Sequence, residues 1–201
     1  MSSQKTRVAV FISGNGSNLQ ALIDASKAGT LDAQIVLVVS SNQEAYGLTR
    51  AKVQKIDTFV FVKKNHPTPH DADKALMEEL GSHQVDYVAL AGYLKMIPIA
   101  VLKAYPDRVV NIHPALLPRY GGKGMYGHFV HEAVIANGET ESGPTVHLVD
   151  EIYDHGRILE QARVDVLPDD TPETLAARVL DKEHELYPIA LNKLIKGEYG
   201  I

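Results

Sequence analysis

The sequence predicts a single-domain α/β protein with a Rossmann-like open sheet. The sheet is expected to be mostly parallel, with an antiparallel edge and helices on both faces. Several apolar runs are continuous rather than alternating, which indicates strands buried on both faces. Each run is followed by a segment with helical spacing, as in βαβ units. The chain has 201 residues and no repeat or long linker, so residues 1–201 are expected to form one domain.

The first strand and helix have the clearest signals. Residues 8–12 are a continuous apolar run, which a polar turn at residues 13–18 interrupts. Three apolar residues at helical spacing follow, namely Leu19, Leu22 and Ile23. Gly29 is expected to end this helix, because glycine readily adopts the left-handed conformation found after a helix.

The remaining elements are expected from the same patterns. Strands are expected at residues 35–39, 58–62, 85–91 and 109–113, and helices at residues 45–53, 71–80 and 128–136. The runs at residues 145–149 and 158–166 are expected to pair as antiparallel strands at the sheet edge. A last helix is expected to begin near residues 171–173 and to extend toward Leu194, because Pro172 suits a first helical position.

The composition excludes several classes of protein. The formal net charge is −5, from 20 Lys and Arg against 25 Asp and Glu, whereas proteins that bind nucleic acid are usually basic. There is no cysteine, which excludes disulfides, thiolate metal sites and cysteine nucleophiles. No apolar run approaches the ~20 residues of a membrane helix. The first run is too short for a signal peptide. We therefore expect a cytoplasmic protein without nucleic-acid or membrane partners.

A glycine-containing turn joins the first strand to the first helix. Gly14 and Gly16 allow a sharp turn, and the free N–H groups at the helix start favour an anion such as phosphate. Ser17 and Asn18 add side-chain donors. The dinucleotide fingerprint would require glycine where Leu19 stands, and no Gly-Lys-Ser/Thr follows as in a P-loop. The alternative is a tight turn without a ligand.

Two polar side chains occupy the end of the fifth predicted strand. Asn111 and His113 lie two residues apart, so they point to the same face, at the edge where open α/β sheets bind ligands. An amide and an imidazole there can polarise a carbonyl and protonate the oxyanion that forms. A carboxylate from Asp150, Glu151 or Asp154 would raise the pKa of the histidine, but spacing does not choose among them. The alternative is a hydrogen-bonded strand end without catalysis.

Two histidines on one predicted helix have the spacing of metal ligands. His128 and His131 lie three residues apart, but no third ligand accompanies them and the His-Glu-x-x-His order is absent. Two such histidines are more often surface residues, so no metal is expected.

Five segments together resemble the glycinamide ribonucleotide formyltransferase family. They are ISGNGSNLQ at 12–20, AGYLKM at 91–96, NIHPALLP at 111–118, GPTVH at 143–147 and DEIYDHG at 150–156. This family transfers a formyl group from 10-formyltetrahydrofolate to the amino group of glycinamide ribonucleotide in de novo purine biosynthesis. The resemblance implies that activity, with the folate as co-substrate. It also implies Asn111, His113 and Asp154 as catalytic residues.

The resemblance further implies two binding regions. Residues 1–113 would hold the phosphosugar, and residues 114–201 would supply the folate loop and the C-terminal helix. The ribonucleotide residues would be Gly16, Ser17, Asn18, Leu180, Asp181, Lys182 and Glu183, with Glu183 as a direct contact. The folate residues would be Leu94, Lys95, Met96, Ile97, Asn111, Asp150, Glu151, Ile152, Tyr153 and Asp154.

Some features depart from the family pattern or extend it. Family members often carry a folate-contacting arginine where this chain reads Thr-Pro-His-Asp at 68–71, so Lys63, Lys64 or His70 is a candidate substitute. The peptide bond between Leu117 and Pro118 matches one that is cis in the family. The glycine-rich stretch at residues 119–127 is expected to be a flexible loop over the site, or else a mobile surface loop.

Three other activities compete with this interpretation. Methionyl-tRNA formyltransferase shares the catalytic pattern but uses a further C-terminal domain to hold RNA. Formyltetrahydrofolate deformylase carries an extra N-terminal domain, which is not expected here because the first strand is predicted to begin at residue 7. A non-catalytic phosphosugar- or folate-binding module would not require the three catalytic residues. The chain is expected to be a monomer or a homodimer with small-molecule substrates.

Overall fold

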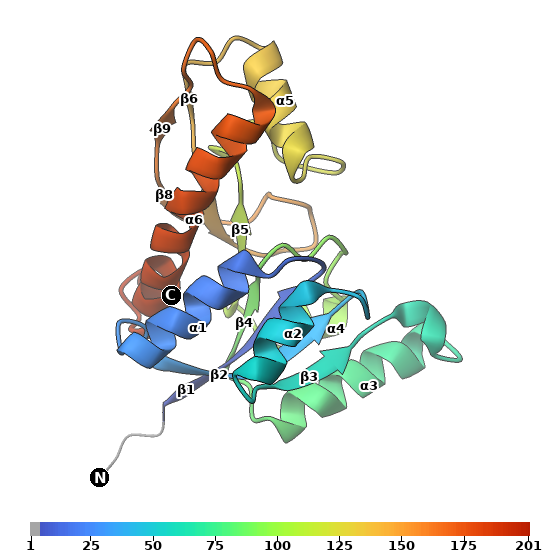
Figure 1. Ribbon diagram of the computed structural model, residues 1–201. Coiled ribbons are helices and arrows are strands. Elements are labelled where there is room, and N and C mark those ends of the chain that lie inside the picture. The colour runs from blue at the N-terminus through green and yellow to red at the C-terminus, as the bar shows by residue number, and fades with distance from the viewer. Residues whose placement is uncertain (1–4) are drawn as a thin grey trace.

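A seven-stranded sheet forms the centre of the computed structural model, which describes residues 5–201 (Figure 1). Its strands are β1 (Thr6–Ile12), β2 (Ala33–Ser40), β3 (Asp57–Val60), β4 (Tyr87–Leu90), β5 (Val109–His113), β7 (Thr145–Leu148) and β8 (Ile158–Gln161). They lie in the order β3-β2-β1-β4-β5-β7-β8. The first five pair in parallel, whereas β7 is antiparallel to β5 and β8 is antiparallel to β7. The predicted parallel sheet with an antiparallel edge is confirmed; residues 1–4 of the predicted domain lie outside the described residues.

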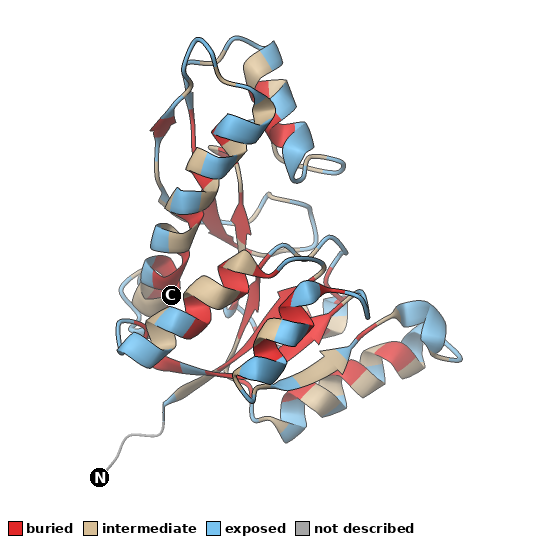
Figure 2. Cartoon of the chain, in the orientation of Figure 1, coloured by how far each residue is buried: buried red, intermediate tan, exposed pale blue. Residues whose placement is uncertain are grey.

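Helices cover both faces of the sheet. They are α1 (Ser17–Ala28), α2 (Tyr46–Val53), α3 (Pro69–Ser82), α4 (Ile99–Ala104), α5 (His128–Ala136) and α6 (Pro172–Ile195), with a 3-10 turn η1 (Lys63–Asn65). Alternate residues of β1 divide between two cores, as the two-residue period of a strand requires. Val8, Val10 and Ile12 pack with α1, α2 and α6, whereas Ala9 and Phe11 pack with α3 and α4. Figure 2 shows that buried residues gather in the strands and on the helix sides that face them, whereas the outer faces of the helices are exposed.

The prediction of a single strand over residues 158–166 is wrong. Its first part is β8, and its second part is β9 (Val164–Asp165), which pairs with β6 (Glu141–Ser142) in a separate small sheet. The chain leaves the large sheet where Gly143 approaches the carbonyl of Ala162 so closely that a Cβ on Gly143 would lie 1.9 Å from that oxygen. A third apolar cluster joins this region to α5 and α6.

Smaller differences concern short segments and helix ends. Helix α4 was not predicted, because its six residues are too few to show helical periodicity. Helix α3 begins at Pro69, two residues before the predicted start, because the Thr68 side chain accepts a hydrogen bond from the backbone N–H of Asp71. The peptide bond between Leu117 and Pro118 is cis, as the resemblance implies.

Helix α6 lies beside α1 and connects distant parts of the chain (Figure 1). A capping box of Thr171 and Thr174 begins it, with proline in its first turn. Tyr187 is fully buried, and its hydroxyl donates to the carbonyls of Leu90 at 2.9 Å and Val110 at 3.2 Å. These bonds fix α6 against the last residue of β4 and the second residue of β5, and Glu183, one helical turn before Tyr187, lines the cavity at the carboxyl end of β5. Among residues 5–201, no helix has both the length and the apolar character needed to cross a membrane.

Candidate active site

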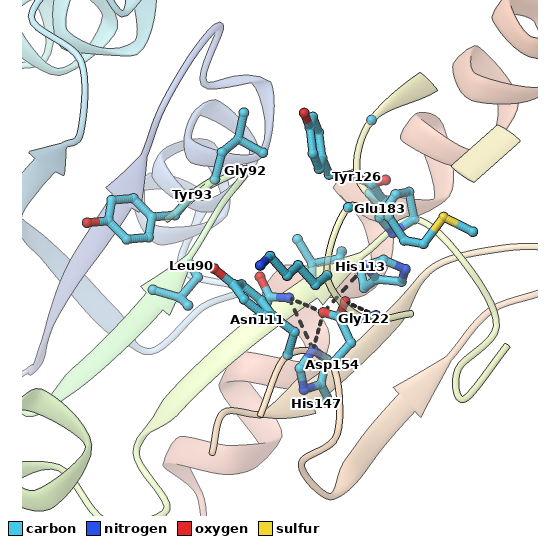
Figure 3. A pocket seen from close by; sticks show the side chains of 18 of the residues that line it. Leu90, Gly92, Tyr93, Asn111, His113, Gly122, Tyr126, His147, Asp154 and Glu183 are labelled. Atoms are coloured by element: carbon cyan, nitrogen blue, oxygen red, sulfur yellow. Dashed lines mark hydrogen bonds and ion pairs between the residues drawn. The ribbon is translucent and has the colours of Figure 1, made fainter. Parts of the chain in front are cut away.

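Four polar side chains meet at the carboxyl end of β5 (Figure 3). Asn111 and His113 come from the last residues of that strand. His147 of β7 lies directly opposite Asn111, because the two strands pair antiparallel in that register. Asp154 lies in the loop after β7 and has a left-handed backbone, with φ of 54°. Aspartate tolerates this conformation better than most residues.

Asp154 is the centre of this cluster. Its Oδ1 lies 3.5 Å from Asn111 Nδ2, 3.5 Å from His113 Nδ1 and 3.6 Å from His147 Nε2. Its Oδ2 accepts a hydrogen bond from the backbone N–H of Gly122 at 2.9 Å. Burial alone would raise the pKa of Asp154. The hydrogen bond of His147, the charges of His113 and His147 and the Gly122 N–H together outweigh that effect, so the pKa lies below its usual range. The carboxyl is therefore ionised at neutral pH.

The ring of His113 has an oxygen atom facing each nitrogen. Nε2 lies 2.7 Å from the backbone carbonyl of Tyr120, and Nδ1 faces Asp154. A carbonyl oxygen only accepts hydrogen bonds, so Nε2 carries a proton in the neutral and in the cationic ring. The proton that titrates is therefore the one on Nδ1.

The expectation that a carboxylate raises the pKa of His113 is confirmed for the contribution of Asp154, but the net pKa is lowered. Burial lowers the pKa of His113, and this outweighs the rise caused by the Asp154 carboxylate and by the Tyr120 carbonyl. His147 lowers it further. The ring of His113 thus loses its Nδ1 proton at a lower pH than an exposed histidine. Negative charge that develops near the ring would favour protonation of Nδ1.

His147 is a site residue to which the sequence analysis gave no role. It is 2% exposed, and its Nδ1 lies 2.7 Å from the carbonyl of Leu148. Nδ1 must therefore carry a proton. When the ring is neutral, Nε2 accepts a hydrogen bond from Asn111 Nδ2 at 3.1 Å; when the ring is cationic, Nε2 donates toward Asp154 Oδ1 at 3.6 Å instead. The other N–H of Asn111 faces Asp154 at 3.5 Å. The signal in the sequence was the end of the GPTVH segment, which includes this histidine.

A buried glutamate and an asparagine form a second polar pair. Asn18 Nδ2 donates to Glu183 Oε2 at 2.5 Å, which joins the start of α1 to α6. Burial raises the pKa of Glu183 to about 7, although the bond from Asn18 opposes this. Asn18 Oδ1 is buried and has no hydrogen-bond partner among the described residues. This pair can therefore offer hydrogen-bonding groups to a ligand.

The turn before α1 has the geometry expected of an anion site. Gly16 precedes the helix with φ of 76°, and a Cβ there would lie 2.8 Å from Gly47 Cα, so glycine is required. No side chain of the described residues caps the first turn of α1. Its N–H groups are thus available at the positive end of the helix dipole.

A cavity of about 660 Å³ connects the cluster around Asp154 with the pair of Asn18 and Glu183. The predicted site residues that line it are Asn18, Leu94, Lys95, Met96, Ile97, Asn111, His113, Asp150, Ile152, Tyr153, Asp154, Leu180 and Glu183. The predicted residues Gly16, Ser17, Glu151, Asp181 and Lys182 are not among its lining residues. Lys182 instead pairs with Glu185 on the exposed side of α6. Helical geometry explains this, because neighbouring residues of a helix point in different directions.

The outer wall of the cavity is apolar and exposed. Leu94, Met96 and Ile152 have relative exposures of 53%, 46% and 61%, which is high for large apolar residues. Such a patch is typical of a surface that a ligand covers. The proposed substitutes for the family arginine, Lys63, Lys64 and His70, do not line this cavity.

The two histidines of α5 differ in their surroundings. His131 is 4% exposed and lines the cavity, and burial lowers its pKa to about 4. His128 is exposed and lies 3.8 Å from Glu132. His131 is therefore not the surface residue that the sequence predicted. Within residues 5–201, no group of three or more potential ligand side chains is placed to hold a metal ion.

An acid–base cluster beside a large cavity, at the carboxyl edge of an open α/β sheet, defines an enzyme site of the group-transfer type. Residues 6–191 match the formyl transferase family, and the chain belongs to that family.

Proteins of this family with assigned functions are similar over most of the chain. Phosphoribosylglycinamide formyltransferase of Haemophilus influenzae is 39% identical over 191 residues, which are 95% of this chain and 88% of that protein. The chloroplastic phosphoribosylglycinamide formyltransferase of Arabidopsis thaliana is 45% identical over 185 residues, which are 92% of this chain and 63% of that protein. This chain therefore spans less than two thirds of the plant relative. The crystal structure of the Brucella melitensis phosphoribosylglycinamide formyltransferase superposes with a TM-score of 0.87 at 44% identity, covering 94% of this chain and 95% of that one.

Proposed function

We propose that this protein transfers the formyl group of 10-formyltetrahydrofolate to the amino group of glycinamide ribonucleotide. The products would be formylglycinamide ribonucleotide and tetrahydrofolate, as in de novo purine biosynthesis. The observation that carries the proposal is the convergence of Asn111, His113 and Asp154 on one wall of a cavity whose other end reaches Asn18 and Glu183. The similarity to proteins named for this reaction supports it.

The two ends of the cavity suit the two substrates. The uncapped first turn of α1, whose Asn18 lines the cavity, would hold the ribonucleotide phosphate together with Gly16 and Ser17. Glu183 and Asn18 would contact the sugar hydroxyls. The apolar wall at residues 94–97 and the loop at residues 150–154 would hold the folate. In this proposal residues 1–113 and residues 114–201 contribute the phosphosugar half and the folate half, with α6 completing the nucleotide end.

The chemistry would consist of one bond formed and one broken. The substrate amine attacks the formyl carbon, so that a new C–N bond forms while negative charge grows on the formyl oxygen. The formyl oxygen would accept hydrogen bonds from the Asn111 N–H that otherwise faces Asp154 at 3.5 Å and from Nδ1 of the protonated His113 ring, while Asp154 keeps that ring oriented. When the bond to the folate nitrogen breaks, the proton from the amine passes to that nitrogen through a water molecule. The nucleophile is the substrate itself, and holding both substrates together supplies much of the acceleration.

A formyl-transfer assay with three acceptors tests this proposal. Formyl transfer to glycinamide ribonucleotide, with little transfer to water or to methionyl-tRNA, is expected. Preferential hydrolysis would indicate a deformylase, and preferential transfer to tRNA would indicate the tRNA-specific enzyme. Binding of either substrate without any transfer would indicate a non-catalytic binding module. The cytoplasmic location and the oligomeric state stay predictions.

A further inference from the structure

Two hydrogen bonds in series connect Glu139 to the ring of His113. The hydroxyl of Tyr120 donates to Glu139 Oε1 at 2.7 Å, and the carbonyl of the same tyrosine accepts from His113 Nε2 at 2.7 Å. We propose that Glu139 and Tyr120 are positioning residues. They hold the proton of His113 on Nε2 and so keep Nδ1 directed toward Asp154 and the reacting atoms. This inference rests on the function proposed above.

The backbone of Tyr120 requires support to stay in place. Its φ is 57°, a left-handed conformation that bulky residues seldom adopt and that persists where the surroundings enforce it. The next residues are Gly121 and Gly122, so the chain beyond is intrinsically pliable. A restraint on the tyrosine is therefore needed to keep its carbonyl at hydrogen-bond distance from His113.

Close packing does not supply this restraint on one side of the segment. A cavity of about 340 Å³ lies against residues 116–120, and residues 139–142, Gln161 and Arg163 line it as well. The ring of Tyr120 packs against the apolar cluster of α5 and α6, and on the cavity side the hydrogen bond to Glu139 fixes its hydroxyl. The carboxylate of Glu139 is in turn paired with Arg119.

Glu139 itself is fixed to the end of α5. Its backbone N–H donates to the carbonyl of Val134 at 3.3 Å, and its side chain is 15% exposed. Val134 is buried in the apolar cluster that α5 forms with α6. Glu139 therefore connects a packed helix to the loop over the active site.

The same contact influences the protonation of His113. The charged and titratable groups that face its ring are Asp154, His147 and His131, and the Tyr120 carbonyl completes its surroundings. The hydrogen bond to that carbonyl raises the pKa of His113, in opposition to burial. Loosening this bond would therefore make the ring lose its proton at a lower pH.

Three substitutions isolate the tyrosine–glutamate bond. Tyr120→Phe removes the donor, and Glu139→Leu removes the acceptor. Glu139→Gln retains an acceptor oxygen of nearly the same shape and is the rescue variant. Glu141→Leu is the matched control, because Glu141 lines the same cavity and pairs with Arg163, with no hydrogen bond to Tyr120 among the described residues.

Nuclear magnetic resonance of the imidazole nitrogens reads the position of the proton directly. Signals of His113 are assigned by their absence from the spectrum of His113→Asn. The wild-type protein is expected to show a protonated Nε2, and Tyr120→Phe and Glu139→Leu are expected to show a mixture of the two neutral forms. A wild-type ring protonated on Nδ1 alone, or variants with unchanged spectra, would overturn the inference.

Formyl-transfer kinetics provide the second readout. Tyr120→Phe and Glu139→Leu are each expected to lower kcat about tenfold while KM stays within about twofold. The limb on which kcat/KM falls with rising pH is expected to move to lower pH. The double variant should lose no more than the worse single variant, since both changes remove the same bond. Glu139→Gln should recover most of the loss.

Several results would contradict a positioning role. Equal losses in Glu139→Leu and Glu141→Leu would indicate general damage around the cavity. A lower kcat with an unchanged pH profile and unchanged spectra would indicate a purely structural effect. If the wild-type protein transfers no formyl group, the proposed function fails, whereas the nitrogen spectra still decide how His113 is held.

Discussion

Replacing Glu183 with glutamine is expected to stabilise the folded protein above neutral pH relative to the wild type. The wild-type carboxyl is buried, and burial raises its pKa from the usual 4.5 to about 7. An acid whose pKa is higher in the folded state binds its proton more tightly there than in the unfolded chain. Stability therefore falls as pH rises through the interval between these two values. Glutamine does not ionise, and its amide oxygen can still accept the hydrogen bond from Asn18.

The magnitude follows from the size of the shift. A rise from 4.5 to about 7 is roughly 2.5 pKa units, at about 1.4 kcal/mol each, so the full penalty is about 3.5 kcal/mol. The free energy of unfolding of Glu183→Gln, minus that of the wild type, should increase by up to this amount between about pH 5 and about pH 8.

Urea unfolding at several pH values measures this difference. Taking the difference between two proteins cancels the other titrating groups, which the substitution leaves in place. Glu185→Gln is the matched control, because Glu185 is an exposed residue of the same helix, and its difference from the wild type should vary little with pH. A Glu183→Gln difference that stays constant over this pH range would refute the reasoning.

Three further predictions concern the site and its support. Asn111→Ala, His113→Ala and Asp154→Asn should each lower turnover at least about a hundredfold without unfolding the protein, and near-normal turnover in the His113 variant would contradict its role. Gly16→Val should weaken binding of the ribonucleotide more than binding of the folate in calorimetric titrations, because the phosphate turn loses its shape; the reverse order would refute the phosphate site. Tyr187→Phe should lower the free energy of unfolding by about 1–3 kcal/mol, because two buried carbonyls lose a donor, and an unchanged urea midpoint would show that those bonds contribute little.

The fold was largely predictable because its strands are buried on both faces. Continuous apolar runs such as residues 8–12 and 35–39 identify such strands without any tertiary information. Helix α4 was not predictable, because its six residues are too few to show a helical period in the apolar residues. The split between β8 and β9 depends on the close approach of Gly143 to Ala162, which are distant in sequence.

The site was only partly predictable, for a related reason. The spacing of Asn111 and His113 on a strand indicates a shared face. Asp150 and Asp154 belong to the same loop, and the sequence alone could not decide which of them faces His113. Asp150 Oδ2 lies 2.7 Å from His155 Nδ1, whereas the left-handed Asp154 turns inward. Glu183 has no local signal, because its partner Asn18 belongs to the other end of the chain.

The packing of α6 on α1 has a consequence for how the protein is made. The apolar face of α1 has no cover from α6 until the segment at residues 172–195 leaves the ribosome. Until then the nascent chain exposes an apolar surface, and such surfaces are prone to aggregation during folding. Activity should therefore appear only once this segment has folded, because it contains both Glu183 and Tyr187, whose hydroxyl holds α6 against the sheet.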